Sequence, residues 1–159
     1  MKITTKTRYG LRAMVEIARE TDREGILQKE ISLRQKLSNK YLDQIVLALK
    51  TANLIMNVHG KKSGYILARP ADTITLLDIH QAFEPAFHMV DCLAPNYVCE
   101  KEHTCSSKLF WQGLNNVVID YFKSFTLQQI LDKQTELESL PNLSCTQIKC
   151  EKQMKSTAG

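Results

Sequence analysis

The sequence lacks any apolar run long enough to cross a bilayer, so it predicts no transmembrane helix. Its opening residues, from Met1 to Tyr9, also lack the apolar stretch of a signal peptide. We therefore expect a cytoplasmic protein, in a compartment where thiols stay reduced. The odd count of five cysteines also argues against a closed disulfide framework.

The residue patterns of common enzyme classes are missing as well. The sequence contains no nucleophile–base constellation, no phosphate-binding glycine loop and no H-E-x-x-H motif. The enzyme alternative is an iron–sulfur or zinc enzyme, and these absences argue against it. We predict that the chain is not an enzyme.

Charge is unevenly divided along the 159 residues. Residues 1–70 carry 14 Lys and Arg against 6 Asp and Glu, whereas residues 71–159 carry 7 against 11. The basic first part predicts contact with a polyanion, although a merely solvated basic surface has the same composition.

Three amphipathic segments in this basic part predict a helix-turn-helix. Helices are expected over Thr7 to Arg19 and Leu27 to Arg34, and Ser38 can cap a third that runs to about Thr51. Generic three-helix packing is the alternative, but a short helix, a tight turn and a polar-faced helix follow the helix-turn-helix order. The residues then expected in a major groove are Ser38, Asn39, Lys40, Tyr41 and Gln44.

A β-hairpin is predicted directly after the third helix. Two short apolar runs, Leu54 to Val58 and Tyr65 to Ala68, flank a basic segment bounded by glycines. A hairpin in this place is a wing, and Lys61 and Lys62 at its tip are expected to touch phosphates or a minor groove. The fold class predicted is therefore mainly α with a small β-hairpin wing.

Three of the five cysteines lie together in a predicted loop. Six residues separate Cys92 from Cys99, and five separate Cys99 from Cys105. A loop can direct three thiolates at one centre, and thiolates suit iron–sulfur clusters, zinc and copper(I). Structural zinc sites usually have ligand pairs closer together in sequence, so these wider gaps favour a cluster. Three free or buried loop cysteines are the other interpretation.

The most periodic segment runs from Lys108 to Phe125. Its apolar residues step by three and four, as in a coiled-coil seam, and they are Trp111, Leu114, Val118, Tyr121 and Phe125. Such a helix docks either on its own domain or on a second copy of the chain. Two capping boxes, one at Thr75 before this segment and one at Thr126 after it, open helices expected to end near Phe83 and Lys133.

Four separate motifs resemble the bacterial winged-helix regulators of the Rrf2 family, which include IscR, NsrR, RirA and CymR. The motifs are Lys2 to Leu11, Leu37 to Gln44, the wing Gly60 to Tyr65 and the three cysteines, and they span roughly residues 1–135. The resemblance implies a homodimeric transcription factor that pairs through the long helix and often holds one 2Fe–2S or 4Fe–4S cluster per subunit. A dimer of this kind is expected to bind double-stranded DNA at a near-palindromic operator.

Some positions depart from the family pattern. Arg8, Arg12 and Lys108 stand where relatives supply a fourth cluster ligand. His103, inside the cysteine loop, is the leading side-chain candidate for that ligand, and a thiol or water from solution is at least as plausible. His59 stands where many relatives have an arginine before the first wing glycine, and we count it among the DNA-contacting residues.

We predict a winged helix-turn-helix domain over residues 1–72, a cluster-binding loop with dimerisation helices over 73–135, and a polar, flexible tail over 136–159. The predicted function is a repressor or dual regulator that senses iron, redox state or nitric oxide through a cluster on Cys92, Cys99 and Cys105. The alternative is a cluster-free, CymR-like regulator that acts through a partner protein or through cysteine oxidation.

Overall fold

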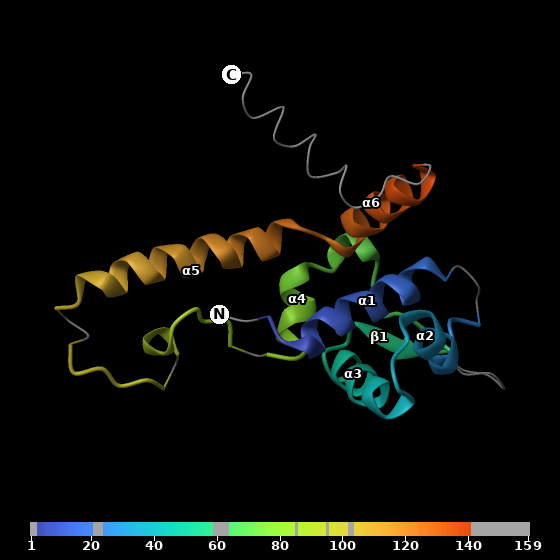
Figure 1. Ribbon diagram of the computed structural model, residues 1–159, viewed down its shortest axis with the longest axis horizontal. Coiled ribbons are helices and arrows are strands. Elements are labelled where there is room, and N and C mark those ends of the chain that lie inside the picture. Colours follow the sequence, from blue (N-terminus) through green and yellow to red (C-terminus); the bar gives the residue numbers. More distant parts are fainter. Residues whose placement is uncertain are drawn as a thin grey trace, which may run out of the picture.

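The computed structural model describes residues 3–20, 24–58, 64–84, 86–94, 96–101 and 104–140. The fold is mostly helical, with one two-stranded antiparallel hairpin (Figure 1), which confirms the predicted fold class. The elements follow in the order α1 (Thr5–Arg19), α2 (Gln28–Gln35), α3 (Asn39–Thr51), β1 (Ile55–Asn57), β2 (Tyr65–Leu67), η1 (Ala71–Thr73), α4 (Leu76–Gln81), η2 (Asp91–Leu93), α5 (Ser106–Ser124) and α6 (Leu127–Ser139).

Helix α1 is the central element of the fold. It begins where the Thr4 hydroxyl accepts the backbone N–H of Thr7 at 3.3 Å, so the helix starts slightly earlier than predicted. Its inner face is apolar, and Ala13 and Met14 are completely buried. Helix α1 packs against α2, α3 and β2 of the helix-turn-helix and hairpin, and also against the later helices α4 and α6. It therefore belongs to a core that both groups of elements share.

The turn between α2 and α3 is tight. Lys36 ends α2 with a left-handed backbone (φ 53°), and the N–H of Leu37 donates to the Ser32 carbonyl at 3.0 Å. On either side of this connection, Ile31 of α2 and Leu42 of α3 are completely buried in one hydrophobic core. The predicted helix-turn-helix geometry therefore follows from one sharp C-terminal cap and a shared apolar core.

The hairpin is extended by a short backbone pairing on its β2 side. Strands β1 and β2 pair with Met56 opposite Ile66, and Ile26 exchanges backbone hydrogen bonds of 3.1 and 2.8 Å with Tyr65. Gly25 permits this approach, since its φ is +66° and a Cβ there would lie 2.7 Å from the Tyr65 carbonyl oxygen. The hairpin stem is thus attached to the segment that leads into α2.

A second backbone pairing joins the start of α4 to the start of α6. The Leu76 N–H donates to Phe125 at 2.9 Å, and the Leu127 N–H donates to Ile74 at 2.8 Å. Both predicted capping boxes are confirmed at this point, with Thr75 capping α4 and Thr126 capping α6. The cysteine loop and α5 therefore leave the core and return to it at one place.

The ends of two helices differ from the prediction. Helix α4 ends at Gln81 rather than near Phe83, and α6 continues to Ser139 rather than ending near Lys133. The extra turns of α6 are held by an ion pair of 2.8 Å between Arg19 and Glu138, so part of the expected flexible tail is helical. Within the part of the chain that the structure describes, no helix is long and apolar enough to cross a membrane.

Gly10 lets the ring of Phe83 pack directly on α1, and this contact generates our first prediction. A Cβ at Gly10 would lie 2.2 Å from Phe83 Cε2, so we expect Gly10→Ala to lower the free energy of unfolding by about 1–3 kcal/mol through overpacking. Urea denaturation measures the change. In a Phe83→Ala background the same substitution should be neutral or stabilising, because alanine is the better helix former. Equal losses in the two backgrounds would contradict the packing argument.

Candidate nucleic-acid interface and cysteine loop

The first turn of α3 presents polar side chains to solvent. The Ser38 hydroxyl accepts the Tyr41 N–H at 3.3 Å and so fixes the start of the helix. Ser38, Asn39, Lys40 and Gln44 are exposed, Tyr41 is half-buried, and the opposite side of α3 lies in the core. A rigid helix with an exposed polar first turn has the form required to read base edges in a major groove.

Tyr41 is held in place by α1. Its ring meets the Tyr9 ring edge-on, with 5.9 Å between centroids and 85° between planes. The Arg12 guanidinium lies over the Tyr9 ring, 5.4 Å from its centroid. The orientation of a predicted base-reading residue therefore depends on α1.

Gln28, at the start of α2, connects α3 to the hairpin stem. Its amide nitrogen donates to the Asp43 carboxylate and to the Asn39 carbonyl, and its amide oxygen accepts from the Tyr65 hydroxyl at 3.1 Å. Burial, followed by the charge of Asp43, raises the pKa of Tyr65 above its ordinary value, so its hydroxyl remains a donor. One amide thus fixes α3 relative to β2.

The base of the wing is described, but its tip is not. The Val58 N–H donates to Gly64 at 2.9 Å, and a Cβ at Gly64 would lie 2.4 Å from the Glu24 carbonyl oxygen, so only glycine fits there. His59, Lys61 and Lys62 lie outside the described residues. Their contacts with DNA stay predictions.

The three loop cysteines are half-buried free thiols. Cys92 lies in η2, Cys99 lies in the loop and Cys105 caps α5. Soft thiolates suit an iron–sulfur cluster chemically, but no three His, Cys, Asp or Glu side chains among the described residues are grouped closely enough to hold a metal. His103 lies outside the described residues, so its predicted role as a ligand is untested.

Two buried polar side chains fasten the start of the loop to α4 and α5. The Asn115 side-chain oxygen accepts the Met89 N–H at 3.0 Å, and Asn115 is only 8% exposed. His80 is 4% exposed, and its ring lies 4.9 Å from that of Phe87 and 5.7 Å from that of Phe122. The segment that precedes Cys92 is therefore packed against two helices.

Glu84 joins this packed segment to the start of α1. Its carboxylate accepts from the hydroxyls of Thr4 and Thr7 at 2.8 Å each, and it lies 3.9 Å from His80 Nε2. Burial raises the pKa of Glu84, but the two hydroxyl donors and the neighbouring histidine outweigh it, so the pKa is lower than usual. A charged carboxylate at neutral pH thus links the loop to the N-terminus of α1.

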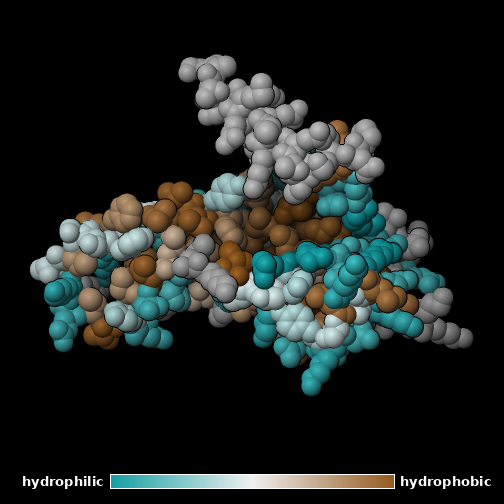
Figure 2. All heavy atoms as spheres, viewed as in Figure 1, coloured by the Kyte–Doolittle hydropathy of each residue, from teal (hydrophilic) through white to brown (hydrophobic). Residues whose placement is uncertain are grey.

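Helix α5 carries two apolar faces. Trp111, Leu114 and Val118, predicted as part of one seam, are half-buried, while Phe125 lies just beyond the helix end. A second face is exposed and gives α5 the hydrophobic surface visible in Figure 2; it comprises Leu109, Phe110, Val117 and Tyr121, which are 74, 64, 65 and 59% exposed. Tyr121 is the one member of the predicted seam on this exposed face.

A family model described as Rrf2, iron-dependent transcriptional regulator, matches residues 3–133. The chain belongs to the Rrf2 family. Protein rrf2 of Nitratidesulfovibrio vulgaris is 30% identical over 131 residues, covering 82% of this chain and 87% of the relative. The structure of CymR, the global cysteine regulator of B. subtilis, matches with a TM-score of 0.71 and 31% identity, over 84% of this chain and 98% of CymR. The structure of T. potens IscR matches with a TM-score of 0.69 and 27% identity, over 89% and 94% of the two chains.

Membership confirms three expectations for this Rrf2 regulator. It is a DNA-binding transcriptional regulator, it has the winged-helix fold, and its relatives are regulators rather than enzymes. Relatives named IscR and relatives named CymR both match, so membership alone does not assign a cluster.

Gln28, Asn115 and Glu84 were not singled out from the sequence of this Rrf2 regulator. Asn115 carried a usable signal, because it lies four residues after Trp111 and three before Val118, on the same side of the predicted helix as these apolar residues. Gln28 and Glu84 carried none, because the partners of each come from distant segments.

Replacing Gln28 should loosen the link between the recognition helix and the hairpin. We expect Gln28→Ala to raise the Kd for an operator selected from random DNA by roughly three- to tenfold, since hydrogen bonds that orient α3 are lost. Binding to random DNA and its salt dependence should stay unchanged, because phosphate contacts are kept. Fluorescence anisotropy measures both, with the exposed Gln128→Ala on α6 as control. A parallel loss on operator and random DNA would instead make Gln28 a phosphate contact.

Proposed function

We propose that this Rrf2 regulator senses iron, redox state or nitric oxide through an iron–sulfur cluster held by Cys92, Cys99 and Cys105. The observation that carries the proposal is three free, half-buried thiols in the segment between α4 and α5. A bound cluster would supply an iron centre that oxidants, nitric oxide or chelators can alter. His103 is the leading side-chain candidate for a fourth ligand. A cytoplasmic location keeps the thiols reduced.

The chain's own residues provide a route from the loop to DNA. Asn115 and His80 fasten the start of the loop, and Glu84 holds the hydroxyls of Thr4 and Thr7 at the N-terminus of α1. Tyr9, further along α1, contacts Tyr41 of the recognition helix. A change in the order of the loop would therefore alter how α1 supports α3, which is the two-state element that a switch requires.

The DNA contacts proposed for each subunit come from α3 and the wing. Gln44 can bond bidentately to adenine, and the basic balance of residues 1–70 favours a polyanion. The proposed contacts in the major groove are Ser38, Asn39, Lys40, Tyr41 and Gln44, and those of the wing are His59, Lys61 and Lys62.

We further propose a homodimer that binds a near-palindromic operator. The exposed face of α5 supports this, because four large apolar side chains on one helix face favour burial against a partner. Tyr121 lies on this face, with Trp111, Leu114 and Val118 half-buried beside it and Phe125 just beyond. If two copies of the chain pair through α5 about a two-fold axis, their two α3 helices are presented to one DNA duplex.

A cluster-free regulator is the second candidate. It is favoured by the separation of the three sulfurs in the described part of the loop and by the structural likeness to CymR. In that case a partner protein, or oxidation of the loop cysteines, would act through the same contacts of Asn115, His80 and Glu84.

Anaerobic purification separates the two candidates. We expect coloured protein with visible absorbance and bound iron and sulfide, because three thiolates are available to hold a cluster. Cys92→Ser, Cys99→Ser and Cys105→Ser should each remove the absorbance and the iron. Cys145→Ser and Cys150→Ser are matched controls that should keep both. Colourless wild-type protein, or full iron content after Cys99→Ser, would contradict the cluster.

Single charges on α5 test the dimer. Val117→Glu should produce a monomer that keeps its helical circular dichroism, because Val117 is 65% exposed in the chain but buried in the proposed interface. Gln112→Glu adds the same charge to an exposed polar residue that α-helical geometry places on the other side of α5 from Val117, and it should leave the dimer intact. Sedimentation velocity measures the mass. Dimers of equal stability from both variants would rule out this face.

A further inference from the structure

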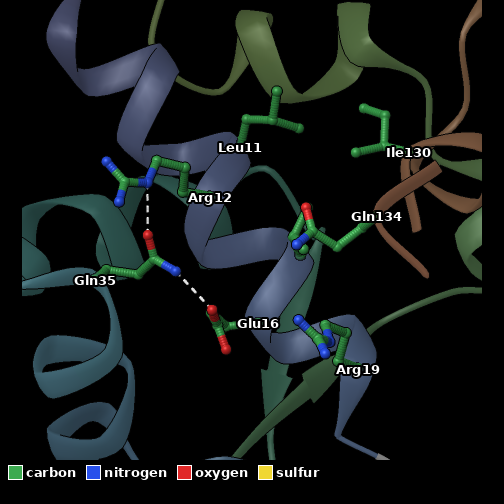
Figure 3. Close-up of a pocket in the computed structure, with 8 residues that line it drawn as sticks. Leu11, Arg12, Glu16, Arg19, Gln35, Ile130 and Gln134 are labelled. Atoms are coloured by element: carbon green, nitrogen blue, oxygen red, sulfur yellow. Dashed lines mark hydrogen bonds between the residues drawn. The ribbon is translucent and has the colours of Figure 1, made fainter. Parts of the chain in front are cut away.

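We infer that a cavity between α1, α2 and α6 binds a small monocarboxylate with a short apolar chain, as an effector site whose lining includes no residue of the cysteine loop of the same chain. The cavity has a volume of about 350 Å³ (Figure 3). That volume falls at the lower end of small-molecule sites, which measure about 300–1,000 Å³. The inference uses the DNA-binding activity of the family and does not depend on the proposed cluster.

One part of the cavity is apolar. Leu11 and Val15 line it from α1 and Ile130 lines it from α6. Figure 3 shows Leu11 and Ile130 on facing elements. All three side chains are only half-buried, so each still exposes apolar surface to the cavity. A ligand that covers them gains by removing this surface from water.

The polar part of the cavity is largely paired already. The Gln35 amide oxygen accepts from Arg12 Nε, and its nitrogen donates to Glu16 Oε1 (Figure 3). Arg34 occupies the second oxygen of Glu16 at 3.2 Å, and Glu16 is only 9% exposed. Both oxygens of this carboxylate therefore already accept a hydrogen bond, one of them from a cationic guanidinium.

Arg12 keeps unused binding capacity. Arg19, the other arginine of the cavity, is engaged by Glu138 through two hydrogen bonds of 2.8 Å. The terminal nitrogens of Arg12, by contrast, find no hydrogen-bond acceptor among the described residues, because its one bond there uses Nε. A planar guanidinium with free terminal N–H groups matches a carboxylate. An anionic group at Arg12 and an apolar chain along Leu11, Val15 and Ile130 define the ligand class.

A ligand bound in this cavity would affect the proposed DNA-binding surface through the contacts of Arg12. The Arg12 guanidinium lies 5.4 Å from the Tyr9 ring, and Tyr9 contacts Tyr41 of α3. A carboxylate that bonds to Arg12 offsets part of the positive charge that attracts the guanidinium to the Tyr9 ring. We expect it to weaken the support of Tyr41 and so to lower operator affinity.

Hexanoate and hexanol are matched probes for the full-length protein, since they differ in the charged group. Calorimetry should show saturable hexanoate binding, with hexanol about tenfold weaker, because a charge-assisted bond contributes on that order. Arg12→Gln should weaken hexanoate about tenfold and leave hexanol unchanged. Arg8→Gln is the control, because Arg8 is an exposed arginine on the same helix outside the cavity.

Saturating hexanoate should lower operator affinity about fivefold, the lower end of allosteric coupling. Tyr9→Leu should keep binding but lose this effect.

Several results would overturn the inference. Absence of saturable hexanoate binding would do so, as would equal losses in Arg12→Gln and Arg8→Gln. Equal affinity for hexanoate and hexanol would reduce the site to apolar surface. Binding only to the Val117→Glu monomer would show that a second copy of the chain covers the cavity. Unchanged operator affinity at saturating hexanoate would remove the effector role.

Discussion

The backbone pairing of Thr75 with Thr126 determines how the two parts of the chain are joined. At this point two helices are capped, and the flanking residues Ile74 and Leu127 are completely buried in the common core. The cysteine loop and α5 therefore begin and end at one fixed place. Any change in their order acts on a core that also contains α1 and the recognition helix.

Helix α1 carries the contacts through which such a change would travel. Its N-terminus meets Glu84, its middle meets Tyr41 through Tyr9, and its outer face forms the cavity at Arg12. The same helix thus lies between the proposed cluster loop, the proposed effector site and the DNA-binding surface. The proposed cluster and the proposed effector could both change DNA binding, because the loop and the cavity both contact α1.

The sequence predicted those features that neighbouring residues determine, namely the helices and where they begin. The apolar period predicted the helices, and the caps at Ser38, Thr75 and Thr126 fixed their starts. It failed where distant contacts decide: α6 is prolonged by a pairing of Glu138 with Arg19, 119 residues away in the sequence. Periodicity predicted α5 but not which apolar face packs on its own chain. Cysteine spacing likewise predicted a donor set, but spacing does not determine whether the loop brings the sulfurs together, and no three possible ligands are grouped among the described residues.

We propose that the state of the cysteine loop changes the affinity of the protein for its operator. It is tested most directly by the affinity of one anaerobic preparation for its operator, before and after a chelator removes the cluster. We expect a change of at least about fivefold for the wild type, in the range of allosteric couplings. We expect no change for Cys99→Ser, which lacks one of the proposed cluster ligands. Equal wild-type affinities before and after removal would contradict the claim.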